Sequence, residues 1–469
     1  MYRLFGLNPL GYHVAIAIVI FLSLWLFYLA LEQLLEDRVA ALAIVLLYGL
    51  LPHYSTVRLW LATTQITVSM AAYFLAVYSD TRQLLANTAW GWTTLSVVCL
   101  LLSGLSYEAF LPLFLVNPIV MGLKHIQIRR RGQEPCRKTW EWWLYYLRNP
   151  PLILLILGFK FLVTSRASSI QEPWIKNAFP AAVELNFGAY GMRLPHVLGA
   201  IWRRYFDAPT FILSLVITLI IALYLARLAI TTSQRQFRVV EIFALTLAAF
   251  VLTGLSYAYF WTTFGFGVGI NNRVAVAASV PVSILIAGLA GLFSRILGRG
   301  NVGNLLFCVL ISLCCGCAYW IDQTIASFWI ESSHRQQVIL SQIQQAIANP
   351  PKGTSILLDG YCPWTGPGII FETDWDLTGV FAFAYNDPSI QGDVLWPQMQ
   401  VSERAVLNPT EKTTYPFASL YFYDVGKQQA TRVIDQEAAL RLQRESVADP
   451  RNACIAKQSI YDGFGTPIW

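Results

Sequence analysis

The sequence predicts a polytopic α-helical membrane protein with about ten transmembrane helices and a small C-terminal extracytoplasmic domain of α/β or α+β type. Three observations support this fold class. Of the 469 residues, 56% are hydrophobic and only 13% are charged, which is about half the roughly 25% charged residues of an average soluble domain. Apolar runs long enough to cross a bilayer recur up to residue 322. The rest of the chain is polar and contains no such run.

Charge divides the chain at the same place. Residues 1–322 hold 23 Lys or Arg and 12 Asp or Glu, whereas residues 323–469 hold 10 and 15. We therefore predict a transmembrane domain over 1–322 and a soluble extracytoplasmic domain over 323–469. The composition excludes a soluble cytoplasmic enzyme, a disordered chain and a secreted disulfide scaffold. The small net charge of +6 does not indicate a nucleic-acid partner.

Ten apolar segments are predicted to span the membrane. They must be helices, because backbone groups in lipid have to pair within their own segment and the segments lack the alternating pattern of barrel strands. The second, fourth and sixth are shorter than the usual ~20 residues. The segments are 11–31, 39–51, 61–78, 89–103, 107–122, 152–164, 209–230, 239–259, 273–293 and 305–322.

The connecting loops predict the orientation. Loop 124–148 holds seven Lys or Arg, and the short loops around Arg235 and Arg295 lie two and four spans later. Positive loops stay in the cytoplasm, so loops 165–208 and 259–272 fall outside. We expect an integral protein of the bacterial plasma (inner) membrane with membrane lipid as a partner and both termini on the outer face.

The C-terminal domain is predicted to begin with an amphipathic helix over 331–348, which ends at Asn349-Pro350-Pro351. Short apolar runs bounded by turn residues predict strands. Three are expected singly and two more as a hairpin. They cover 355–358, 368–372 and 380–384, and the hairpin joins 419–425 to 428–434.

Acidic residues and cysteines are the candidate ligands of this domain. Five aspartates on predicted loops could bind a divalent cation, but their spacing favours a solvated surface; they are Asp359, Asp374, Asp376, Asp387 and Asp393. No cofactor is identifiable, and a divalent metal is the one candidate. Cys362 and Cys454 are the only cysteines of the domain, and an oxidising compartment would permit a disulfide bond between them.

Five ionisable residues of the membrane part fall at one depth, near the outer face. They are His53, Arg58, Glu108, Lys160 and Arg273. Ionisable groups inside a membrane are functional candidates, and a basic cluster suits the phosphate of a lipid-linked ligand. We therefore predict lipid-phosphate binding by Arg273, Lys160, Arg58 and His53. The alternative is that local ion pairs form, for example between Glu108 and Arg58 or Lys160.

Four short segments carry a resemblance to a known family: 7–13 (LNPLGYH), 50–60 (LLPHYSTVRLW), 106–112 (SYEAFLP) and 272–277 (NRVAVA). Together they resemble the GT-C type membrane glycosyltransferases, the protein O-mannosyltransferase-like group that uses polyprenyl-phosphate sugars. The resemblance covers about residues 5–290. It implies sugar transfer from a polyprenyl-phosphate donor at the outer face of the membrane.

The chain departs from the pattern of that family at its acidic residues. The family's catalytic acid lies in a first outer loop, and this chain begins at what resembles the end of that loop, without the first span. Thr56 stands where the family has a glutamate in the second segment, so only Glu108 and Arg273 match directly as charged groups. Glu108 is the single, weak candidate for a catalytic residue. The base could instead lie upstream, or come from Glu172, Glu184 or the outer domain.

Two functions are carried forward. The first is a membrane glycosyltransferase, a hexosyltransferase with a polyprenyl-phosphate sugar as its partner. The alternative is a non-catalytic degenerate relative that acts as a membrane scaffold or binds a glycan or a protein partner. A transporter is disfavoured, because the two halves of the membrane part are not alike and the polar residues lie at its edge.

Overall fold

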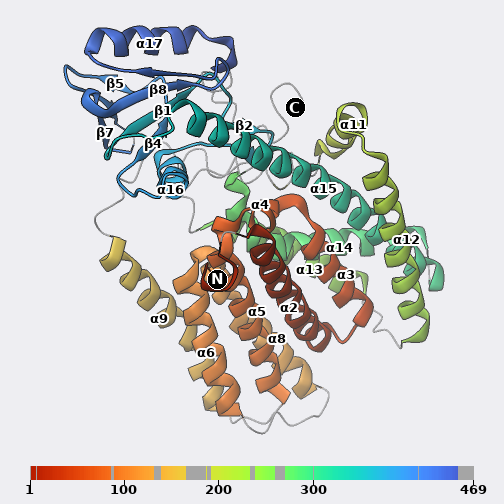
Figure 1. Ribbon diagram of the computed structural model, residues 1–469. Coiled ribbons are helices and arrows are strands. Elements are labelled where there is room, and N and C mark those ends of the chain that lie inside the picture. The colour runs from red at the N-terminus through yellow and green to blue at the C-terminus, as the bar shows by residue number, and fades with distance from the viewer. Residues whose placement is uncertain are drawn as a thin grey trace. The chain divides into compact units, whose positions relative to one another are not determined.

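The computed structural model describes residues 2–6, 8–85, 89–130, 139–164, 186, 192–232, 238–258, 270–298, 300–409 and 411–452. It divides into two compact units at residue 323. The first unit is helical, and the second contains all the strands (Figure 1). A mostly helical chain with a small C-terminal sheet region is thus confirmed.

The described residues of the first unit form mainly helices. The ten predicted segments overlap these helices, but 239–259 runs past the end of α13 and beyond the described residues. Among the described residues, six helices are long and apolar enough to cross a membrane, or seven if one bent pair is a single span. The main helices are α2 (Pro9–Leu35), α3 (Arg38–Leu50), α5 (Thr64–Leu85), α6 (Ala89–Ser106), α8 (Val116–Arg130), α9 (Thr139–Thr164), α11 (Leu194–Arg204), α12 (Ala208–Thr231), α13 (Val239–Leu255), α14 (Ser279–Leu297) and α15 (Asn301–Ala346).

Aromatic side chains fill the centre of this unit. Helices α2, α5 and α6 lie side by side. The Phe27 and Phe74 rings stack at 4.5 Å, and Tyr48 meets Phe74 edge-on at 5.4 Å. On the outside, α12 exposes Ile212, Leu219 and other large apolar side chains along its length. Contiguous apolar surface of this extent is unusual on a soluble protein and is compatible with lipid contact.

Helix α15 joins two elements that the sequence analysis separates. The predicted last span, 305–322, and the predicted amphipathic helix, 331–348, belong to one continuous helix, Asn301–Ala346. No proline or glycine lies between residues 317 and 346, so nothing in the local sequence ends the helix there. The change from apolar to amphipathic composition therefore marks a change of surroundings, not a helix end.

The second unit is built on a sheet with the order β4-β1-β8-β9. β1 (Ser355–Asp359) lies between β4 (Gln391–Val394) and β8 (Leu420–Asp424) and runs parallel to both. β9 (Gln429–Arg432) pairs antiparallel with β8, as the predicted hairpin requires. A second, antiparallel sheet contains β5 (Gln400–Val401), β6 (Ala405–Asn408) and β7 (Thr413–Pro416).

Both faces of the parallel sheet are covered. Ile356 and Leu358 of β1 join one core with the last turns of α15 and with α16 (Asp374–Ala384). Leu357 points to the other face and packs in a core that includes Ala439 of α17 (Gln436–Ala448). A strand buried on both faces is expected to be mostly apolar, as the run Ile356-Leu357-Leu358 is.

Several expectations for this unit are wrong. Asp359 lies in β1, and Asp374 and Asp376 lie in α16, not on loops. The predicted strand 368–372 is reduced to β3 (Gly368–Ile369). Residues 380–384, predicted as a strand, end helix α16. This helix begins with a capping box of Thr373 and Asp376, whose start signal outweighs the short apolar run. Asp393, predicted on a solvated loop, lies in β4 and is fully buried. It accepts hydrogen bonds from Asn408 and from the Tyr415 hydroxyl, each at 2.8 Å, so buried donors replace water.

Candidate functional site

The helical path breaks between α3 and α5, in the segment that carries the second resemblance motif. Pro52 has no backbone N–H and cannot continue α3. Three short elements follow it: η1 (Pro52–Tyr54), α4 (Ser55–Leu59) and η2 (Leu61–Thr63). The chain bends by 45° between α3 and the following helical segment, Pro52–Leu59. Irregular backbone at membrane depth is tolerated only where protein or water satisfies its polar groups.

The Arg58 side chain provides hydrogen-bond partners for backbone carbonyl groups at this break. Its guanidinium donates to the carbonyl oxygens of Gly49 at 2.6 Å and Leu51 at 2.5 Å. Both carbonyls lie at the end of α3, where the helix no longer provides partners. Asp322 of α15 neutralises the cation at 3.1 Å, and the Tyr54 ring lies 4.8 Å from the guanidinium carbon. Arg58 therefore holds the broken segment and α15 together.

Asn272 ties the fourth resemblance segment to the second. It lies in η6 (Ile270–Val276) and is buried. Its oxygen accepts from the Thr56 backbone N–H at 3.2 Å, and its amide nitrogen donates to the Ser55 hydroxyl at 2.9 Å. Asn272 thus contacts Ser55 and Thr56, which lie more than 200 positions away in the sequence. The family resemblance assigns no role to Asn272.

Arg273 and His53 flank this contact. The Arg273 guanidinium carbon lies 5.5 Å from the centre of the Trp60 ring, a cation–π arrangement. Arg273 is half-buried. His53 is 2% exposed. His53, Arg58 and Arg273 are therefore all attached to the same broken segment.

Glu108 and Lys160 form a separate ion pair. Glu108 opens η3 (Glu108–Phe110) and Lys160 lies in α9, and both side chains are largely buried. This is one of the local pairs considered from sequence. The structure thus divides the five predicted residues into two groups, and it adds Asp322, which the sequence analysis used only as the end of the last span.

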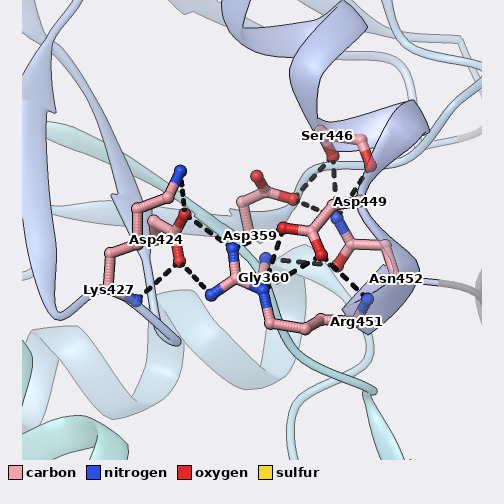
Figure 2. Close-up of polar contacts among 8 residues, drawn as sticks. All are labelled: Asp359, Gly360, Asp424, Lys427, Ser446, Asp449, Arg451 and Asn452. Atoms are coloured by element: carbon pink, nitrogen blue, oxygen red, sulfur yellow. Dashed lines mark hydrogen bonds and ion pairs between the residues drawn. The ribbon is translucent and has the colours of Figure 1, made fainter.

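In the C-terminal unit, strand order brings acidic residues to one edge of the sheet. Asp359 and Asp424 end the parallel neighbours β1 and β8 and lie in register. Figure 2 shows how Arg451 sits between Asp424 and Asp449. Arg451 binds both oxygens of Asp424, each at 3.0 Å, and also pairs with Asp449. Lys427 adds a second cation to Asp424, at 3.0 Å.

These pairs control the charge at this edge. Arg451 donates hydrogen bonds to Asp449 and Asp424, and these bonds raise the pKa of its guanidinium. Burial opposes ionisation of Asp424, but hydrogen bonds from the Lys427 backbone and from Arg451 leave its pKa below the usual value. The network is therefore fully charged, and its charges are paired, at neutral pH.

A second set of hydrogen bonds anchors Asp359. One oxygen accepts from the Ser446 hydroxyl at 2.6 Å and from the Asn452 amide at 2.7 Å. Asn452 in turn accepts from the backbone N–H of Gly360 at 3.1 Å (Figure 2). Gly360 has φ +72°, a conformation that favours glycine. Burial raises the pKa of Asp359.

Gly426 gives a stability prediction for this network. A Cβ atom at this position would lie 1.6 Å from Arg451 Nη1, so Gly426→Ala must displace the guanidinium. We expect a loss of about 1–3 kcal/mol in unfolding free energy, measured as faster hydrogen exchange in β8 of the full-length protein. The matched control is Gly379→Ala in α16, where a Cβ meets nothing within 4 Å and the helix should gain up to ~1 kcal/mol. Equal exchange rates in both variants would contradict the packing argument.

The structure bears on the predicted metal site and on the predicted disulfide bond. Within the described ranges, no group of three His, Cys, Asp or Glu side chains could hold a metal ion. Cys362 is disulfide-bonded, whereas Cys99, Cys308, Cys314, Cys315 and Cys317 are free thiols. Cys454 lies outside the described residues, so its pairing with Cys362 remains a prediction. Glu172 and Glu184 also lie outside them.

Comparison with known proteins identifies no relative. No protein-family model matches the chain, and neither the curated proteins nor the solved structures contain a match.

Proposed function

We propose that this protein is an integral membrane scaffold without transferase activity, which presents its C-terminal domain to a glycan on the outer side of the plasma membrane. In this proposal the membrane part follows the ten-span layout predicted above, with both termini outside. It corresponds to the non-catalytic alternative of the sequence analysis. The apolar helices are compatible with membrane integration.

The observation that supports this proposal is the pairing of the cations in the helical unit. Arg58, Lys124, Arg148 and Lys160 each have a carboxylate partner, and each pair joins different elements. The partners are Asp322, Glu36, Asp80 and Glu108. A carboxylate neutralised in this way is a poor general base, because accepting a proton would break its ion pair.

The ion pairs of Arg58 and Lys160 also disfavour phosphate binding by these two side chains. Arg58 already donates to two carbonyl oxygens and to Asp322. A lipid phosphate would have to replace these internal partners, leaving buried acceptors unsatisfied. Lys160 would similarly have to leave Glu108. Both groups are therefore better suited to holding helices together than to stabilising a leaving phosphate.

A transfer assay tests the proposal. Full-length protein in lipid nanodiscs would be incubated with polyprenyl-phosphate hexoses labelled in the sugar and with a membrane extract as acceptor. We expect no transfer above empty nanodiscs, for the wild type and for Arg273→Ala alike. Transfer by the wild type above empty nanodiscs would overturn the proposal. A fall of about 10²-fold or more in Arg273→Ala, but not in the exposed control Arg38→Ala, would in addition assign a role in that transfer to Arg273.

That contrary outcome would support the second candidate, a polyprenyl-phosphate-dependent glycosyltransferase. One observation favours it: the second, third and fourth resemblance segments coincide with the interruptions of the helices, at η1, η3 and η6. Arg273 lies among them as a half-buried cation beside Trp60. In this candidate, Arg273 would hold the leaving phosphate.

A further inference from the structure

The order of the strands in the C-terminal unit marks one position as a candidate binding site. From β1 the chain passes through α16 to β4 on one side of β1, and later returns to β8 on the other side. The carboxyl end of β1 is therefore the point where the strand order reverses. In open α/β sheets, ligands bind in the crevice outside the carboxyl ends of the strands at such a point.

A cleft lies at this position. Its volume is about 460 Å³, within the range of roughly 300–1,000 Å³ found for small-molecule sites. Gly360 and Tyr361, which follow β1, and Val425, which follows β8, line one part of it. Val338 and Gln342 of α15 also line it. All of these residues belong to the C-terminal unit.

The charges around the cleft select against ionic ligands. Arg451 reaches the cleft, but it is paired with Asp424 and Asp449. Arg335, the other cation of the wall, is paired with Glu331 at 2.7 Å. An anion would have to compete with these carboxylates, and the described residues contain no group of three His, Cys, Asp or Glu side chains that could hold a metal ion. Guanidinium groups in such pairs still offer N–H donors to neutral hydroxyl groups.

The rest of the cleft wall offers both apolar contacts and uncharged hydrogen-bonding groups. Val338 and Val425 provide aliphatic contacts, while the Gln342 amide provides one acceptor and two donors. A sugar ring has matching properties, since its C–H groups form apolar patches and its hydroxyls both donate and accept. We propose that this cleft binds a neutral hexose unit of a glycan, an inference that rests on the proposed scaffold function and locates its binding site.

Titration calorimetry on full-length protein in nanodiscs tests the site. The probes are neutral disaccharides of glucose, mannose and galactose. We expect at least one to bind, and Val338→Trp to abolish its binding by filling the cleft. Gln342→Ala should weaken binding by about 3–10-fold, the effect of one lost hydrogen bond. The matched control, Gln337→Trp, introduces the same bulk at an exposed position of α15 outside the cleft and should bind as the wild type does.

The outcomes separate this inference from the proposed function. Disaccharide binding that survives both Val338→Trp and Gln342→Ala would place the sugar elsewhere and overturn the cleft, but leave the scaffold proposal standing. Binding of sugar phosphates in place of neutral sugars would overturn the ligand class. Absence of any sugar binding by the wild type would overturn the inference, and polyprenyl-phosphate transfer in the assay above would overturn the scaffold function.

Discussion

Replacing Arg58 with alanine is expected to lower the unfolding free energy of the helical unit by about 3–5 kcal/mol, the usual effect of removing one partner of a buried ion pair. The variant leaves the Asp322 carboxylate without its cation, and both side chains of this pair are less than 15% exposed. It also removes the donors to Gly49 and Leu51 at the break after α3. The measurement is the unfolding free energy of full-length protein in detergent under increasing denaturant.

Two further variants show whether charge causes this loss. Arg58→Met combined with Asp322→Leu removes both charges and should recover part of the stability, since an apolar pair can replace a buried ion pair. Arg38→Ala removes an ion pair with Glu32 whose arginine is 59% exposed, and should change stability by no more than ~1 kcal/mol. If Arg58→Ala behaved like Arg38→Ala, the role assigned to Arg58 at the helix break would be refuted.

The C-terminal unit is expected to be more stable near pH 4.5 than at pH 7. Burial raises the pKa of Asp393 to about 6, although hydrogen bonds from Asn408 and Tyr415 oppose that shift. Burial likewise raises the pKa of Asp376 to about 6. Each carboxyl group therefore retains its proton in the folded state over a pH range in which the unfolded chain has already released it.

The sign follows from this difference in proton binding. Below pH ~3.8 a buried aspartate is protonated in both states, and its contribution to stability is fully present. As the pH rises from ~3.8 to ~6, the unfolded state ionises first, and stability falls by up to ~3 kcal/mol for a shift of about two pKa units. Above the folded-state pKa of about 6 the contribution has been lost and no longer changes.

The test is hydrogen exchange in β1 and β4 of the full-length protein at pH 4.5 and 7, corrected for intrinsic rates. Asp393→Asn removes one titrating group and should reduce the difference in stability between the two pH values. Asp387→Asn is the control, because hydrogen bonds from Ser389 lower the pKa of Asp387 and its removal acts in the opposite direction. A pH difference unchanged by Asp393→Asn would show that Asp393 does not cause it.

Much of the fold follows from local composition. Apolar runs predicted the positions of the helices, and the hairpin of β8 and β9 followed from turn residues between two short apolar segments. The sequence predicts a strand over 380–384 because an apolar run of five residues does not distinguish a strand from a helix. The capping residues Thr373 and Asp376 were the signal that would have identified the helix.

The candidate sites were only partly visible in the sequence. His53, Arg58 and Arg273 stood out because charged or titratable residues are rare in apolar segments. Asp322 did not, because it lies where the composition changes and was assigned to a boundary. The cleft in the C-terminal unit was not predicted, since it depends on β1 lying between β4 and β8, and strand order is not encoded in any local pattern.

Composition and periodicity therefore sufficed to establish an apolar helical part followed by a polar domain with strands, because each depends on neighbouring residues in the chain. The partners of the charged groups depended on folding. Arg58 meets Asp322 and Thr56 meets Asn272 across more than 200 residues of sequence. A buried cation can bind a ligand or can join two helices through an ion pair, and the tertiary structure decides which carboxylate lies beside it. The ion pairs formed in this way support the function proposed for this protein.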